Sequence, residues 1–75
     1  MIVNELVKVI ARNQFIEISG QTNFSSPEFN GIAEEFIHSK NFETLAKRTV
    51  RGVLSTIDAN GDDCILIYYD DWKKD

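Results

Sequence analysis

One strand in the last third of the chain limits the possible folds more than any other segment, because both of its faces are apolar. Residues 64–69 read Cys-Ile-Leu-Ile-Tyr-Tyr, so neither alternating set contains a charged side chain. Such a strand needs cover on two faces and a neighbour along each edge. The sequence therefore predicts that residues 64–69 form the centre of a β-sheet.

The segment before this strand is expected to pair with it as a β-hairpin. Residues 50–57 read Val-Arg-Gly-Val-Leu-Ser-Thr-Ile, and residues 58–62, Asp-Ala-Asn-Gly-Asp, separate the two strands. Asn60 and Gly61 tolerate the positive φ that a tight reversal needs, and an aspartate can hydrogen-bond its own backbone two residues on. A turn is therefore predicted over residues 58–62.

The N-terminal segment has the periodicity of a helix. Its apolar residues recur at helical spacing, at Val3, Leu6, Val7 and Ile10. Asn4 is a candidate cap for this helix. Several of the residues are β-branched, so a strand remains the alternative for this segment.

Residues 15–20 alternate in the manner of a strand. Ile16 and Ile18 share one face, and Glu17 lies on the other. A half-buried strand with a charged outer position suits the edge of a sheet.

Residues 26–39 carry the clearest helix start in the chain. Ser26 can cap, Pro27 suits the first helical position, and Glu28 lies near the positive end of the helix dipole. An apolar stripe then follows at helical spacing, formed by Phe29, Ile32, Ala33, Phe36 and Ile37. One or two further helical turns are expected over residues 42–48.

These elements predict a small α+β domain that spans residues 1–75, in the order α-β-α-(α)-β-β. The expected sheet has three antiparallel strands, with residues 64–69 between residues 50–57 and residues 15–20. Helices pack on this sheet. The pattern leaves open which face the N-terminal helix covers.

Acidic side chains are concentrated at the C-terminal end of the chain. Residues 1–57 contain six glutamates and six lysines or arginines, whereas residues 58–75 contain six aspartates and two lysines. The formal net charge of −4 therefore comes entirely from the hairpin turn and the tail. A chain of this charge is not expected to bind nucleic acid directly.

No pattern of catalytic or cofactor-binding residues is evident. A single cysteine, Cys64, excludes an internal disulfide and a cysteine-rich zinc site, and one histidine, His38, cannot by itself build a triad. The turn fails the calcium-loop spacing, since Gly61 is fourth and Tyr69 twelfth when counted from Asp58. We therefore expect no enzyme, no cofactor and no metal.

The N-terminus does not have the pattern of a signal peptide, because Asn4, Glu5 and Lys8 interrupt its apolar residues. No run approaches the ~20 apolar residues of a membrane span. A cytoplasmic protein that does not bind membranes is expected.

The acidic end of the hairpin is the candidate binding site. Carboxylates on a stiff ribbon present negative charge as a nucleic-acid backbone does, and tyrosine and tryptophan commonly anchor interfaces. The alternative is that turns and tails simply accumulate solvated aspartates while the aromatic residues close the core. The candidate partner-binding residues are Asp58, Asn60, Asp62, Asp63, Tyr69, Asp70, Asp71 and Trp72.

Residues 4–8 and 15–20, together with the acidic turn, resemble the first helix, first strand and acidic hairpin of small phage-encoded anti-CRISPR proteins. The resemblance implies acidic residues that imitate DNA in the basic groove of a CRISPR effector nuclease. It implies that Asp58, Asp62 and Asp63 face the groove, with Asp70 and Asp71 as secondary candidates.

The preferred hypothesis is a non-catalytic acidic inhibitor of phage or mobile-element type, whose protein partner has a basic surface and is expected to be a nucleic-acid-binding enzyme. This protein would be a monomer or a homodimer. One alternative is an assembly protein that dimerises through a sheet face containing Ile65, Ile67 and Tyr69. Another is a nucleic-acid-binding regulator that uses the basic group Lys47, Arg48 and Arg51.

Overall fold

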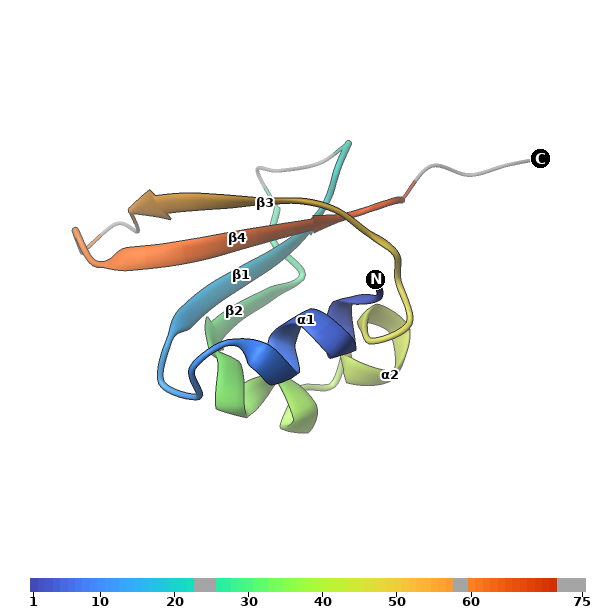
Figure 1. The fold of residues 1–75 in the computed structure, drawn as a ribbon, viewed down its shortest axis with the longest axis horizontal. Helices are drawn as coiled ribbons and strands as arrows, with labels where there is room; N and C mark the ends of the chain where they lie inside the picture. The colour runs from blue at the N-terminus through green and yellow to red at the C-terminus, as the bar shows by residue number, and fades with distance from the viewer. Residues whose placement is uncertain (23–25, 58–59, 72–75) are drawn as a thin grey trace.

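A computed structural model describes residues 1–22, 26–57 and 60–71 of the chain. A four-stranded sheet has its helical segments gathered on one face (Figure 1). The elements in chain order are α1 (Val3–Val9), β1 (Phe15–Gly20), β2 (Phe29–Ile32), the 3-10 helix η1 (Ala33–His38), α2 (Phe42–Leu45), β3 (Val50–Ile57) and β4 (Asp63–Tyr69).

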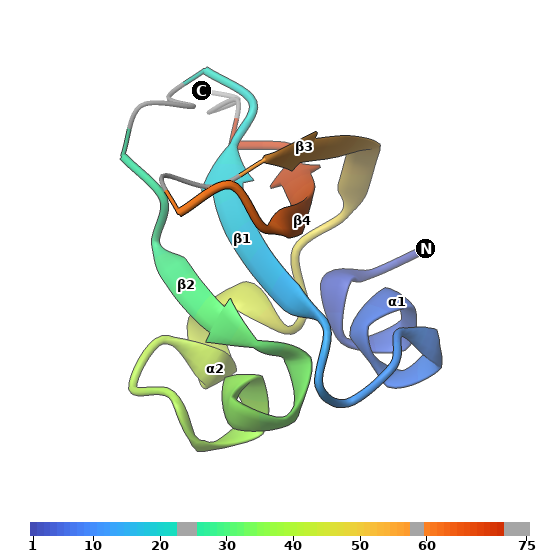
Figure 2. The ribbon, with the colours of Figure 1, turned by 90° about the vertical axis from the view of Figure 1, so that its left-hand side faces the viewer.

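The strand order is β2-β1-β4-β3. The predicted α+β class is confirmed, as is the position of β4 between β1 and β3, but the prediction of three antiparallel strands was wrong. The sheet has four strands and is mixed, because β4 is antiparallel to β3 and parallel to β1. The chain reaches this arrangement by crossing one face of the sheet through η1 and α2 between β2 and β3 (Figure 2), as parallel neighbours require a crossover connection.

β1 is an interior strand rather than the expected edge strand. Ile16 and Ile18 are buried on one face, as predicted, but β2 pairs antiparallel along the outer edge of β1. Glu17, on the opposite face, accepts a hydrogen bond from Asn30 Nδ2 of β2 at 3.2 Å. The charged position of β1 is thus accommodated by a polar neighbour on β2.

The predicted helix over residues 26–39 was wrong in its first half. Phe29–Ile32 forms β2, and only Ala33–His38 is helical, as a 3-10 helix. The outer edge of β1 offers backbone groups that need partners, and the Glu28 amide already donates to the Ile18 carbonyl at 2.8 Å. Pairing with β1 therefore outweighs the local helix signal, since helix propensity is a weak preference.

The apolar residues of this segment still face the core. Phe36 is fully buried and contacts the rings of Phe29 and Phe42 edge to face, at centroid distances of 5.3 and 5.2 Å. Phe42 begins α2, the short helix that the sequence predicted over residues 42–48. This aromatic cluster connects β2, η1 and α2.

α1 is helical as predicted and buries Val3 and Val7, although its cap is Ile2 rather than Asn4. α1, η1 and α2 all lie on the same face of the sheet (Figures 1 and 2). The buried apolar residues form one core between these helices and the sheet: Val3, Val7, Ile16, Ile18, Ala33, Phe36, Leu45, Ala46, Ile67 and Tyr69. We call the other face of the sheet, which contains Glu17, Leu54, Leu66 and Tyr68, the open face.

The hairpin of β3 and β4 forms as predicted, with Ser55 opposite Ile65. Gly61 in the turn has a φ of 86°, a left-handed conformation that favours glycine. Residues 58–59 of the predicted turn lie outside the described residues. A β-bulge interrupts the register between Val50 and Gly52, near the start of β3.

Gly52 allows Tyr68 to lie across β3 on the open face, because a Cβ atom at Gly52 would collide with the tyrosine ring. Gly52→Ala should therefore lower the free energy of unfolding by about 1–3 kcal/mol, the usual cost of overpacking. Chemical denaturation of Gly52→Ala, alone and combined with Tyr68→Ala, tests this contact. The cost of the alanine should largely disappear when Tyr68 is already truncated, and an equal cost in both backgrounds would contradict the contact.

Candidate acidic binding site

The acidic turn lies at an end of the β3–β4 hairpin that extends past the helices (Figure 1). Asn60, Asp62 and Asp63 are all exposed there. They border an open hollow, here called the turn hollow, whose lining residues are Asn13, Gln14, Phe15, Ile32, Asn60, Asp62 and Asp63. Three segments distant in the chain therefore meet at the turn: the α1–β1 connection, the end of β2 and the start of β4.

Gln14 holds the turn against the α1–β1 connection. Its Nε2 atom donates to the backbone carbonyls of Phe15 at 2.9 Å and Asp63 at 3.3 Å. Parallel pairing makes this contact possible, because Ile16 lies beside Ile65 and the two strands start at the same end of the sheet. In the antiparallel arrangement that the sequence predicted, the start of β1 would lie beside the end of β4.

In the part of the chain that the structure describes, the lining of the turn hollow combines carboxylates with side-chain amides and includes no basic residue. Asp62 and Asp63 supply two carboxylates, and Asn13, Gln14 and Asn60 supply amides. Carboxylates accept strong charge-assisted hydrogen bonds from guanidinium and ammonium groups, and amide oxygens add further acceptors. The arrangement is suited to receiving an arginine or lysine side chain.

Asn13 and Gln14 were not among the candidate residues from the sequence. They lie in a short polar connection with no motif of their own, and only the parallel pairing of β1 with β4 places them beside Asp63. No local sequence signal marks them.

The other predicted acids lie at the opposite end of β4. A strand rises about 3.3 Å per residue, which places Asp70 roughly 23 Å from Asp63. Asp71 is held by the segment after β1, because its carboxylate accepts hydrogen bonds from Thr22 Oγ1 at 2.5 Å and from the Thr22 amide at 3.3 Å. The structure thus separates the described candidate aspartates into two groups, and of the described candidate residues it brings Asn60, Asp62 and Asp63 together at the turn.

Tyr69 belongs to the core, with 3% of its surface exposed. Its hydroxyl hydrogen-bonds the Glu28 side chain, and the Arg48 guanidinium lies over its ring at 5.4 Å from the centroid. Burial, followed by the hydrogen bond to Glu28, raises the pKa of Tyr69. Asp58 and Trp72, the remaining candidates, lie outside the described residues.

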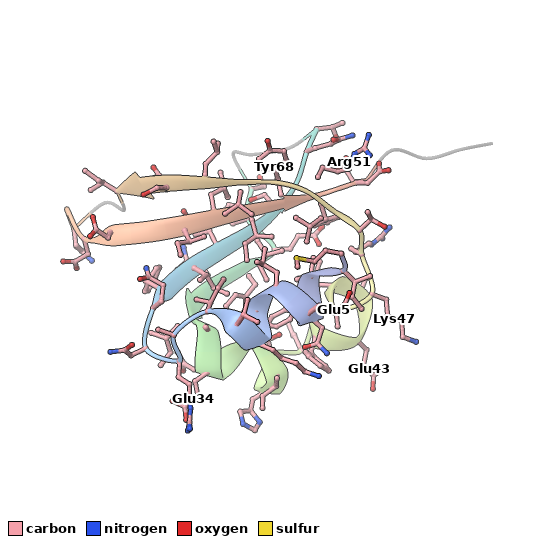
Figure 3. All side chains as sticks on the ribbon, in the orientation of Figure 1. Glu5, Glu34, Glu43, Lys47, Arg51 and Tyr68 are labelled. Carbon is pink, nitrogen blue, oxygen red and sulfur yellow. The ribbon has the colours of Figure 1, made fainter. Side chains whose placement is uncertain are left out.

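The basic group of the sequence is divided in space. Arg48 packs on Tyr69, Lys47 lies on the helix side near Glu43, and Arg51 extends from β3 (Figure 3). His38 is exposed at the end of η1. Cys64 is buried, with its Sγ atom 3.8 Å from Glu17 Oε1.

Within the described ranges, no group of three or more histidine, cysteine, aspartate or glutamate residues is placed to hold a metal ion. No helix in this part of the chain has the length and apolar character that a membrane span requires. A scan with models of known families, a search of curated proteins and a search of solved structures found no match. The anti-CRISPR resemblance therefore stays a prediction.

The raised pKa of Tyr69 predicts an alkaline loss of stability. The folded state holds the phenol proton more tightly than the unfolded chain, whose tyrosine titrates near the ordinary value of 10.0. The stability that the protonated Tyr69 phenol contributes is therefore complete below the pKa of the unfolded chain and is lost as the pH rises above that pKa. Denaturation between pH 8 and pH 11 (~3 pH units that span the tyrosine titration) should show a falling free energy of unfolding for the wild type and a flatter profile for Tyr69→Phe. A slope unchanged in Tyr69→Phe would contradict the assignment.

Proposed function

We propose that the chain is a non-catalytic binding protein whose turn hollow engages a basic surface on a partner protein. The observation that carries this proposal is the pair of exposed carboxylates, Asp62 and Asp63, in a hollow whose described lining residues include amides and no lysine or arginine. Such a site attracts a cationic partner over a distance and fits a cationic side chain at contact.

The position of the site supports binding to a recessed surface. The hairpin turn extends past the helices (Figure 1), so the acids can enter a groove that the body of the domain cannot. Gln14 fixes the turn to β1, which reduces the ordering that binding would otherwise cost. A groove that normally holds nucleic acid has the required positive charge, so the proposed partner is a nucleic-acid-binding enzyme and the proposed mode is inhibition by occupying that groove.

The resemblance to anti-CRISPR proteins makes a CRISPR effector nuclease the first partner to test. In this proposal Asn60, Asp62 and Asp63 make the central contacts. Asp70 and Asp71 lie too far along β4 to share that contact. Asp71 is moreover engaged by Thr22.

Charge reversal at the turn tests the proposal. Asp62→Lys combined with Asp63→Lys should weaken binding to a guide-loaded CRISPR effector nuclease by about a hundredfold or more, because charges at a docked site dominate both association and the bound state. Biolayer interferometry at low and high salt measures this, and wild-type affinity should fall steeply with added salt.

The matched control reverses two exposed acids elsewhere, Glu34→Lys with Glu35→Lys on η1, with the same change in net charge. It should retain most of the affinity. Unchanged binding by the Asp62 and Asp63 variant, in this assay and in capture from host lysate, would exclude the turn as the site. Equal loss in both variants would show that net charge alone is responsible.

The dimer interface predicted over Ile65, Ile67 and Tyr69 has no support from the fold. Ile67 is fully buried and Tyr69 nearly so, because this side of β4 faces the helices. A second copy would have to displace α1 and η1 to reach these residues. That version of the dimer is therefore not proposed.

A further inference from the structure

β3 is an edge strand of unusual character. It is eight residues long, lies at the end of the strand order, and contains one charged residue, Arg51. Val53, Leu54 and Ile57 are 47%, 49% and 66% exposed. Proteins usually protect edge strands by keeping them short, by placing lysine or proline on them, or by covering them. The other edge, β2, follows this rule with four residues.

Among the described residues, those at the N-terminus cover the start of the outer edge of β3. Ile2 forms an isolated bridge with Thr49, and the Val50 amide donates to the Met1 carbonyl at 2.9 Å. Beyond this point β3 pairs, among the described strands, with β4 alone. A run that is long, apolar and nearly uncharged is therefore left as a template for another strand.

We propose that the outer edge of β3 pairs antiparallel with β3 of a second copy of this chain, about a two-fold axis. The two four-stranded sheets would then join into one continuous sheet. Val53 and Leu54 lie at the middle of the strand, near the axis. Val53 would therefore lie close to Val53 of the second copy on one face of the sheet, and Leu54 close to Leu54 of the second copy on the other. An interface of this kind is self-complementary, as two-fold symmetry requires.

The distribution of charge favours a second copy in this orientation. Within each chain Asp62 and Asp63 lie at one end of the hairpin and Arg51 lies at the other (Figure 3 shows Arg51). Asp70 and Asp71 follow β4 at the Arg51 end, where Asp71 is engaged by Thr22. Antiparallel pairing places Arg51 of each copy toward the acidic turn of its partner. Parallel pairing would instead place the acidic turns together. β3 itself contains no acid, so two copies of net charge −4 can meet along it without direct repulsion.

Burial gives a second reason. A chain of 75 residues is near the lower limit for a single unaided core, and association commonly supplies the missing burial in such small proteins. The apolar side chains exposed on β3 belong to both faces of the sheet, since Val53 is in register with buried Ile67 and Leu54 with Leu66 of the open face. Extending the sheet would cover side chains on both faces at once.

This pairing does not depend on the proposed function. Asn60, Asp62 and Asp63 line the turn hollow from the hairpin, and its other lining residues belong to the α1–β1 connection, β1 and β2, on the side of β4 away from β3. A dimer would therefore leave both hollows accessible and would present two acidic sites on one rigid particle. Failure of one proposal leaves the other intact.

Analytical ultracentrifugation tests the dimer. One chain has a mass of 8.6 kDa, and the wild type at about 100 µM should sediment with twice this mass. Val53→Lys and Leu54→Lys should each weaken the dimer by about tenfold or more, because a lysine on each copy would bring like charges together beside the axis. Asn30→Lys on the opposite edge strand is the matched control and should leave the dimer unchanged.

The two lysine variants also distinguish the kind of interface, since their side chains lie on opposite faces of the sheet. Weaker dimer formation in both variants supports edge pairing. Loss with Leu54→Lys alone indicates stacking of the open faces and overturns the proposal, as does a wild type that remains monomeric. If circular dichroism shows that either variant does not fold, hydrogen exchange on the wild type tests the dimer instead. The β3 amides should gain protection as the protein concentration rises from about 5 to about 200 µM, and unchanged protection would overturn the proposal.

Discussion

The parallel pairing of β1 with β4 is the contact on which the rest of the structure depends. It joins two strands about fifty residues apart along the chain, and it places the two strand starts at one end of the sheet and the two strand ends at the other. Gln14 then reaches the backbone of Asp63 at the first end, and Thr22 reaches Asp71 at the second. The turn hollow exists only because of this alignment.

The same pairing decides which acids can act together. β4 runs straight through the sheet, so the aspartates before and after it are held at opposite ends and cannot form one negative surface. One pair borders a polar hollow, and Asp71 is used in a local contact. Tyr69 between them faces the helices and stabilises the core, with Glu28 and Arg48 as its polar partners. The described aspartates of the hairpin thus form two separate groups, one at the turn and one after β4, rather than one continuous negative surface.

Placing every helix on one face has a cost on the other side of the sheet. α1, η1 and α2 complete the core around Phe36, while Leu54 and Tyr68 lie on the open face, away from these three helices. β2 pairs with one edge of β1, whereas none of the described strands pairs with the outer edge of β3. The open face and the outer edge of β3 are where contacts with other chains are expected.

Local patterns in the sequence determined α1, the β3–β4 hairpin with Gly61 in its turn, the central position of β4, and the inward face of β1, because each depends on neighbours only a few residues apart. Tertiary structure decided the rest. Residues 29–32 have a helical pattern yet form β2, since the unpaired backbone of β1 offers hydrogen bonds that a weak local preference cannot match. The direction of β1 relative to β4, and with it the contribution of Asn13 and Gln14 to the acidic site, depends on how the chain crosses the sheet. No short segment contains that information, because it is a property of contacts between residues far apart in the sequence.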